Sequence, residues 1–310
     1  GLGDVYKRQV YLTIDETIQS ICEKYMQKGV EDNNVLNKGV CIAMDVNTGA
    51  ILAMVTTDGY DLNNPYELSA KDKKKIKSTP KKKQAEAESA ALSNMWRNKA
   101  VADTYMPGSV FKMCVASAAL EENLVNEKTL FTCTGSISVE GETIHCSNIS
   151  GHGTQNFVEA ISNSCNPAFI QIGQMLGAGK FRQYYQGFGF SDKTGIDLPG
   201  EAEDSFWKEG KMGGVDLAVA SFGQNFTITP IQMITACAAV SNGGYVVQPH
   251  VVSKITDSKG NVIKSVDKKI KRQVISDDTS KKMNEYLEYN TERQGAAAGC
   301  LLYTSPSPRD

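Results

Sequence analysis

One short stretch, residues 105–112, constrains this chain more than any other. Its serine and lysine, Ser109 and Lys112, are three residues apart, and a Pro-Gly pair stands directly before the serine. Pro-Gly favours a loop, and the apolar pattern that continues to Leu120 predicts a helix. Ser109 then lies in the first helical turn with Lys112 on the same face. A lysine packed among apolar neighbours loses solvation, which lowers its pKa and suits it to act as a base toward the serine.

The Ser109–Lys112 pair also has a plain structural interpretation, a helix N-cap serine followed by a surface lysine. A second motif, Ser164-Cys165-Asn166, argues for chemistry instead. A second serine can relay a proton between the lysine and a leaving amine, and an asparagine amide can bind a substrate carbonyl. S-x-x-K followed by an S-x-N-type triplet is typical of penicillin-binding proteins and class A β-lactamases. Alone, the triplet is equally typical of a polar helix end.

Several further segments, in order along residues 10–299, resemble the transpeptidase domain of a class B penicillin-binding protein. Members of the sporulation, elongation and division types from Gram-positive bacteria are the most similar. The segments that carry the resemblance, besides residues 105–112, are residues 12–15, 18–19, 96–100, 164–169, 195–201, 221–224 and 229–232.

The resemblance implies an α+β fold, with an antiparallel β-sheet flanked by helices, as in penicillin-binding transpeptidases and serine β-lactamases. It also implies a peptidoglycan D,D-transpeptidase that cross-links stem peptides through a serine acyl-enzyme and is acylated by β-lactams. Ser109 would be the nucleophile, Lys112 the base, Ser164 the proton shuttle and Asn166 the residue that orients the substrate. The Ser109 N–H would supply one oxyanion donor. No cofactor and no metal is expected.

Partners and location follow from the same resemblance. We expect a glycosyltransferase partner for the full-length protein, and a position on the outer face of the cytoplasmic membrane, reached through an N-terminal anchor. A net charge of −2 gives no indication of nucleic-acid binding. No apolar run approaches the roughly 18 residues that span a bilayer.

Two other functions remain open. A serine β-lactamase would need a base that positions a deacylating water, such as a Glu-x-x-x-Asn loop, and residues 201–204 lack that pattern. A non-catalytic β-lactam sensor or cell-wall binding module would share Ser109 and Lys112. The surrounding segments favour the transpeptidase over both.

Lys193-Thr194-Gly195 spells the third motif of the family, but we interpret it as a loop unrelated to the active site, because it follows Asn166 too closely. The functional K-T-G belongs on a strand farther along, and none follows. Residues 1–9 and 300–310 resemble adapter-derived sequence. We therefore expect residues 10–299 to be an incomplete transpeptidase domain without its K-T-G strand, which folds marginally and is acylated poorly.

Periodicity predicts the main elements. We expect an Asp15-capped helix with one apolar face, formed by Ile18, Ile21, Cys22, Tyr25 and Met26. The other expected elements are a strand over 10–14, a hairpin of 40–46 and 50–55, strands between 131 and 146 that turn at 140–141, a helix from Pro230 to about 243, strands over 245–256 and 261–266, and a helix from Ser276 or Asp277 to about 290. The lysine-rich residues 71–83 are expected to form a solvated loop, with attraction to anionic wall polymers or lipid as the alternative.

The cysteines divide into two sets. We expect Cys22, Cys41, Cys114 and Cys237 to be core residues. Cys165 alternates with Ser164 and Asn166, so it should point away from substrate toward Cys146 or Cys133. Three states remain open: all three thiols reduced, a Cys146–Cys165 bridge, or a Cys133–Cys146 bridge. A zinc site from Cys133, His145, Cys146 and His152 is disfavoured, because the spacing matches no standard site.

Overall fold

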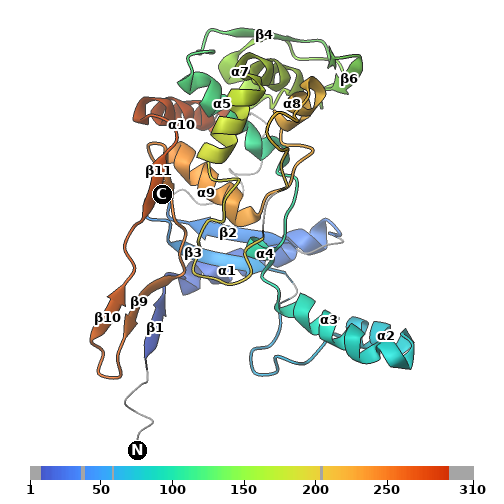
Figure 1. The fold of residues 1–310 in the computed structure, drawn as a ribbon, viewed down its shortest axis with the longest axis vertical. Helices are drawn as coiled ribbons and strands as arrows, with labels where there is room; N and C mark the ends of the chain where they lie inside the picture. Colours follow the sequence, from blue (N-terminus) through green and yellow to red (C-terminus); the bar gives the residue numbers. More distant parts are fainter. Residues whose placement is uncertain (1–7, 36–38, 58, 203–204, 293–310) are drawn as a thin grey trace, which may run out of the picture.

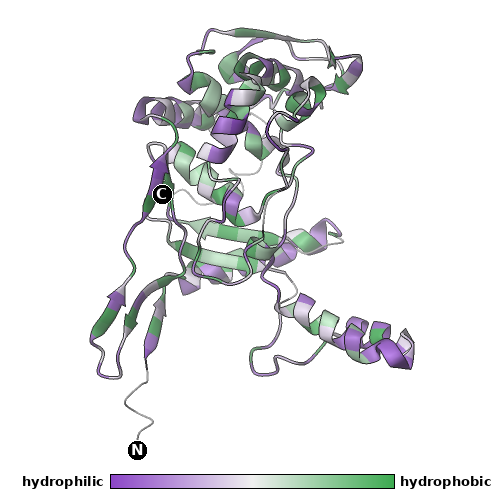
Figure 2. Ribbon diagram, in the orientation of Figure 1, coloured by the Kyte–Doolittle hydropathy of each residue, from purple (hydrophilic) through white to green (hydrophobic). Residues whose placement is uncertain are grey.

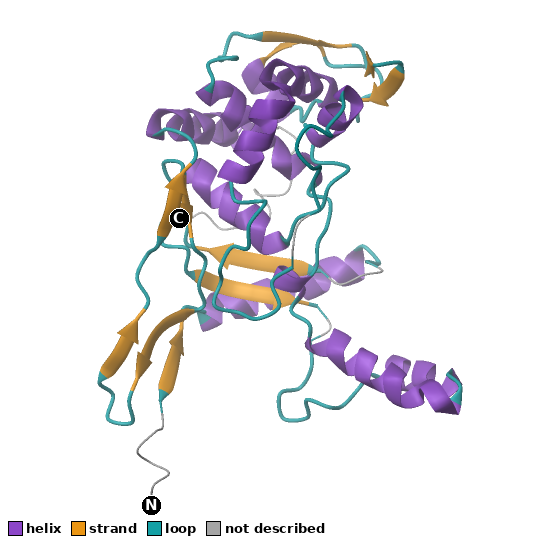
Figure 3. Ribbon diagram, viewed as in Figure 1, coloured by secondary structure: helices purple, strands orange, loops and turns teal. Residues whose placement is uncertain are grey.

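A computed structural model describes residues 8–35, 39–57, 59–202 and 205–292. Helices gather at one end of the molecule, a β-hairpin crosses its middle, and a small sheet and a helical arm extend from the other end (Figure 1). All the strand pairs between the named strands are antiparallel. The expected α+β class with antiparallel strands and flanking helices is confirmed (Figure 3).

The helical end is built around α5 (Lys112–Glu121). This helix is buried along nearly its whole length, and it packs against α6 (Phe157–Ser162), α7 (Asn166–Gly187), α9 (Pro230–Ser241) and α10 (Asp277–Glu292). Helix α8 (Gly214–Ala220) packs on α7. The predicted α9 and α10 are confirmed. Thr229 and Gln232 form a capping box at the start of α9, and the Ser276 hydroxyl accepts from the Thr279 N–H at the start of α10.

The central hairpin pairs β2 (Val40–Met44) with β3 (Ile51–Thr56), as predicted. Helix α1 (Glu16–Asp32) packs against it, and α9 and the short α4 (Lys99–Ala102) pack there too. Asp15 caps α1 by accepting from the Ile18 N–H at 2.9 Å. The predicted apolar face of α1 is wrong in part, because Ile21 and Tyr25 are 50% and 52% exposed. The i, i+4 stripe through Ile18 is partly buried, and Gln19 beside it accepts from the Met54 N–H of β3 at 2.9 Å.

The remaining strands form four small sheets: β1–β9–β10 (Gln9–Leu12, Val252–Thr256, Val262–Ser265), β8–β11 (Tyr245–Val247, Ile270–Gln273), β4–β7 (Leu130–Cys133, Gly153–Asn156) and β5–β6 (Ser136–Val139, Glu142–His145). The expected turn at 140–141 joins β5 to β6. The expected single strand over 245–256 is wrong, because it divides into β8 and β9. Pro249 lies between them, and proline has no N–H to donate to a ladder.

The lysine-rich segment is helical, so the loop prediction is wrong. It forms α2 (Ala70–Ser78) and a short 3₁₀ turn (Lys81–Lys83), followed by α3 (Gln84–Trp96), and the helices make an arm that projects from the body (Figure 1). Ser69 caps α2 by accepting from the Asp72 N–H, and lysines in the last turn complement the helix dipole. Figure 2 shows this helix as hydrophilic and the central hairpin as largely hydrophobic.

An aromatic cluster fixes the start of α5. Phe111 is 2% exposed, and its ring centroid lies 4.9 Å from that of Phe226 and 5.3 Å from that of Phe190. Phe181 and Tyr185 of α7 complete the cluster. The residues on either side of Phe111 are therefore held in place by a close-packed core.

None of the helices in the described part of the chain combines the length and the apolar character that crossing a bilayer requires.

Candidate active site

The candidate nucleophile, Ser109, sits in a tight turn that leads into α5. Residues Gly108–Phe111 form a 3₁₀ turn, and the exposed Ser109 precedes the buried Phe111. Gly108 has a φ of +60° and donates its N–H to the Gly223 carbonyl at 2.8 Å. A Cβ on Gly223 would lie 1.9 Å from the Gly108 carbonyl oxygen, so only glycine allows this contact. The contact with Gly223 thus fixes the backbone of the turn and leaves the Ser109 side chain accessible.

The Lys112 side chain connects the two sequence motifs. Its Nζ lies 3.3 Å from Ser109 Oγ and 2.9 Å from Ser164 Oγ. It also donates to the Ser164 carbonyl oxygen at 2.6 Å and to Asn166 Oδ1 at 2.7 Å. The four residues expected to form the site are therefore together around one amine.

Burial decides the protonation of this amine. Lys112 is 4% exposed, and no carboxylate is among its hydrogen-bond partners. Loss of solvation lowers the Lys112 pKa to about 8, although the nearby Cys165 and Cys146 thiols act in the opposite direction. An amine with that pKa has a substantial neutral fraction near physiological pH, and only the neutral form can accept a proton.

The backbone conformation of the Ser164–Asn166 turn determines where its side chains lie. Ser164 has a φ of +48°, a left-handed conformation that is uncommon for a residue other than glycine. Its N–H donates to the Ile161 carbonyl at 3.0 Å. Asn166 then begins α7, and its Nδ2 donates to the His145 carbonyl at 3.3 Å. Cys165, fully buried, lies between the two polar residues, and its sulfur lies close to those of Cys133 and Cys146, the direction predicted for it.

A comparison with known protein families matches residues 39–305 to the penicillin-binding protein transpeptidase domain. The chain belongs to this family, as a class B member. It is 34% identical over 279 residues to stage V sporulation protein D of Bacillus subtilis, covering 89% of this chain and 40% of that protein. It is 29% identical to peptidoglycan D,D-transpeptidase MrdA of Acinetobacter baumannii, covering 78% of this chain and 35% of that relative. The chain thus spans about two fifths of these curated relatives.

Solved structures share the fold of this transpeptidase domain. The D,D-transpeptidase domain of a peptidoglycan glycosyltransferase from Eggerthella lenta superposes with a TM-score of 0.79 at 23% identity, covering 97% of this chain and 71% of that one. Penicillin-binding protein 3 from Mycobacterium tuberculosis, in complex with aztreonam, gives a TM-score of 0.77 at 24% identity, covering 93% of this chain and 59% of that one. The expected fold is confirmed.

The K-T-G triplet of this transpeptidase domain lies in a loop. Thr194 is 5% exposed, and its N–H and hydroxyl both donate to the Glu201 carboxylate, as does the Gly195 N–H. Gln248 binds the Gly195 carbonyl from another segment. The triplet is therefore part of a loop held by the Glu201 carboxylate, and not part of a strand. This agrees with the interpretation that Lys193-Thr194-Gly195 resembles the family's K-T-G motif only by chance.

The seven cysteines in the described part of the domain are free thiols. Neither of the two considered bridges is therefore formed. Cys114 is buried as predicted, and the partly exposed members of the core set are Cys22, Cys41 and Cys237.

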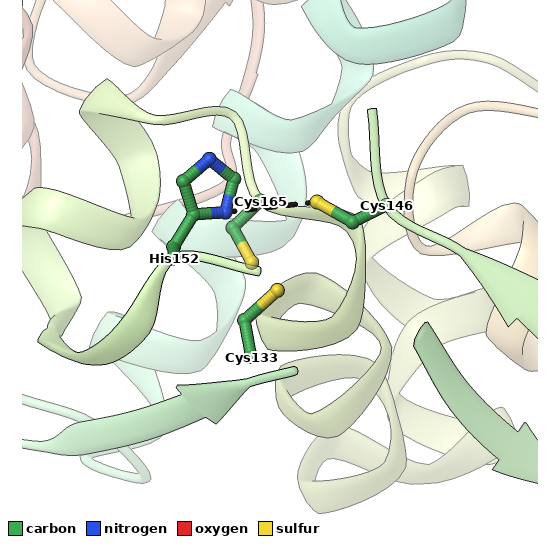
Figure 4. A group of neighbouring side chains, drawn as sticks. All are labelled: Cys133, Cys146, His152 and Cys165. Carbon is green, nitrogen blue, oxygen red and sulfur yellow. Dashed lines mark hydrogen bonds between the residues drawn. The ribbon is translucent and has the colours of Figure 1, made fainter. Parts of the chain in front are cut away.

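The zinc grouping considered from sequence is wrong in one member. His145 is exposed and outside the group, and Cys165 takes its place beside Cys133, Cys146 and His152 (Figure 4). Sequence spacing alone could not choose between two histidines on either side of Cys146.

Proposed function

We propose that this chain provides the catalytic site of a peptidoglycan D,D-transpeptidase that cross-links stem peptides. The observation that carries the proposal is the buried Lys112 amine, which contacts the hydroxyls of Ser109 and Ser164 and the amide of Asn166. This arrangement supports acyl transfer through a serine ester. The names of the relatives support peptidoglycan as the substrate.

Neutral Lys112 has two N–H donors and one lone pair. The Ser164 carbonyl and Asn166 Oδ1 accept the two donors, since neither oxygen can donate in return. The lone pair then faces the serine hydroxyls. When Ser109 Oγ attacks the carbonyl carbon of the penultimate D-Ala, its proton passes to Lys112 Nζ. The Ser109 N–H stabilises the resulting oxyanion.

Collapse of the tetrahedral intermediate breaks the peptide C–N bond and leaves the ester on Ser109. The leaving D-Ala nitrogen takes up a proton from Lys112 through the Ser164 hydroxyl, which lies 2.9 Å from Nζ. The amine of a neighbouring stem peptide attacks the ester in turn and returns a proton to Ser109 by the same route. Asn166 keeps Lys112 in position, and its second Nδ2 hydrogen binds a substrate carbonyl.

β-Lactams would acylate Ser109 in the same way, because they present a strained amide to the nucleophile. Penicillin-binding protein 3 from Mycobacterium tuberculosis has been solved with aztreonam and with ampicillin, which supports this extension. The protein would act on the outer face of the cytoplasmic membrane, where its substrate lies, together with a glycosyltransferase that supplies the glycan strands.

The proposal is tested with the product of the complete gene. It is incubated with a peptide ending in D-Ala-D-Ala and with an acceptor amine, and both free D-Ala and the joined product are measured. We expect equal amounts of the two and none with Ser109→Ala. Hydrolysis of β-lactams with rapid turnover, without any joined product, would instead indicate a β-lactamase. Binding of β-lactams without either peptide product would indicate a sensor.

A further inference from the structure

Three thiols and one imidazole converge beneath the Ser164–Asn166 turn. Their ligand atoms all lie within 4.8 Å of one another, and the three cysteines are each at most 4% exposed. We call this group the thiol–imidazole cluster; its members are Cys133, Cys146, His152 and Cys165 (Figure 4). They come from four places in the fold: the end of β4, the residue after β6, the residue before β7, and the N-cap of α7.

The spacing of these atoms suits a tetrahedral ion. With Zn–S bonds of about 2.3 Å and a Zn–N bond of about 2.0 Å, neighbouring ligand atoms of a tetrahedron lie roughly 3.5–3.8 Å apart. Cys146 Sγ lies 3.6 Å from His152 Nδ1. No other pair needs to contract by more than about 1.3 Å, because all the ligand atoms already lie within 4.8 Å of one another.

The surrounding backbone is already arranged for thiolates. Cys165 is the N-cap of α7, and the N–H groups of the first helical turn favour a negative charge on its sulfur. Such donors stabilise metal-bound sulfur and fix its orientation. Gly151, with a φ of +82°, brings the His152 loop against β4: a Cβ there would lie 2.4 Å from the Cys133 carbonyl oxygen. Glycine at this position permits the approach that completes the cluster.

We propose that the thiol–imidazole cluster binds one zinc ion. Three sulfur ligands and one nitrogen ligand, with no carboxylate, favour zinc over magnesium or calcium. All four positions would be filled by the protein, which is typical of a structural site and leaves no place for a catalytic water. Binding requires the loss of the thiol protons, which pass to solvent.

The zinc site has a consequence for the turn above it. Cys165 lies between Ser164 and Asn166, which both contact Lys112 Nζ. The left-handed backbone of Ser164 is unfavourable for a residue other than glycine, and it persists only where its surroundings fix it. A metal bond to Cys165 fixes this turn to β4, to the segment after β6 and to the loop before β7. In this respect the inference rests on the proposed function, whereas metal binding itself does not.

The test measures zinc in the product of the complete gene, purified without chelator or oxidant, by elemental analysis. We expect His152→Ala to contain one equivalent less than the unaltered protein. His152→Cys, which offers a fourth sulfur, should retain that equivalent, as should His145→Ala, because this neighbouring histidine is exposed and outside the cluster. Cobalt bound in place of zinc should give the absorption bands of tetrahedral thiolate coordination.

A second measurement does not depend on the alanine variant folding. Alkylation of the unaltered protein, mapped by mass spectrometry, should spare the three cluster cysteines until a strong chelator is added. Equal zinc in the unaltered protein and His152→Ala, alkylation that ignores the chelator, or a disulfide within the cluster would each overturn the metal site. Removal of the zinc, confirmed by elemental analysis, that leaves acylation by penicillin unchanged would overturn the effect on the turn alone. Absence of acylation in the zinc-loaded protein would count against the proposed function instead.

Discussion

Lys112 Nζ lies 2.7 Å from Asn166 Oδ1, and this hydrogen bond joins the first residue of α5 to the first residue of α7. Both residues come from short polar motifs at helix starts, and each motif is followed by a buried apolar stretch. The packing of α5 against α7 therefore brings the two motifs together. The position of the amine depends on both helices, because its other partners come from the same two turns.

Replacement of Lys112 by alanine should slow acylation of Ser109 by penicillin at least ~100-fold, the usual size of a lost general base. The rate constant is measured with a fluorescent penicillin in the product of the complete gene. Lys180→Ala is the matched control, since Lys180 is an exposed lysine that pairs with Glu122 at 3.0 Å, outside the site. Equal rates for the two variants would contradict the role of Lys112.

The pH dependence of acylation should follow the Lys112 pKa of about 8. Raising the pH increases the neutral fraction of the amine, so the rate should rise through pH 8 and level off above it. Asn166→Asp places a carboxylate beside Nζ, which favours the charged amine and should move the midpoint upward by about 1–3 pH units. Asn163→Asp adds the same charge on an exposed residue that faces Gln155, and it should leave the midpoint in place. A midpoint that is the same in both variants would exclude Lys112 as the titrating base.

Phe111→Ala should lower the free energy of unfolding by about 3–5 kcal/mol, because it removes the ring at the centre of the aromatic cluster. Urea denaturation followed by circular dichroism measures this change. The neighbouring Val110 is 47% exposed, so Val110→Ala should cost less than about 1 kcal/mol. If Phe111→Ala also cost less than 1 kcal/mol, the cluster would not be what holds the Ser109 turn.

Sequence reasoning proposed the four candidate site residues, which the structure brings together, because the signals of their two motifs are local. A serine and a lysine one turn apart share a helix face, and the helix was predictable from Pro107, Gly108 and the apolar residues after them. The hairpin at 47–49 and the capped α9 have equally local signals. The alternation of Cys165 with Ser164 and Asn166 also predicted the side on which its sulfur lies, close to those of Cys133 and Cys146.

The errors arose where tertiary packing decides. The lysine-rich segment was predicted to be a solvated loop because lysine side chains are strongly hydrated. In the structure Ser69 and Asp72 cap a helix there, and α3 packs against it. Tyr25 has the right spacing for a buried face, yet its side chain is 52% exposed. The choice of His152 over His145 depends on the pairing of β4 with β7, a long-range contact that residue spacing does not reveal.

Lys193→Ala should change the acylation rate far less than the ~100-fold expected for a catalytic lysine. Its neighbours Thr194 and Gly195 bind Glu201, so the triplet serves to fold this loop. Glu201→Gln should destabilise the protein by about 1–3 kcal/mol, the effect of weakening charged hydrogen bonds to partly buried donors. Loss of acylation in Lys193→Ala, with unfolding in urea unchanged, would show that this triplet is the functional K-T-G motif.

The most direct measurement is the site of the covalent adduct. The product of the complete gene is incubated with benzylpenicillin and then digested with a protease. The masses of the resulting peptides are measured by mass spectrometry. One penicilloyl group should be found on Ser109, and Ser109→Ala should carry none while it unfolds at the same urea concentration as the unaltered protein. An adduct on another residue, or equal labelling of Ser109→Ala, would contradict the assignment of Ser109 as the nucleophile.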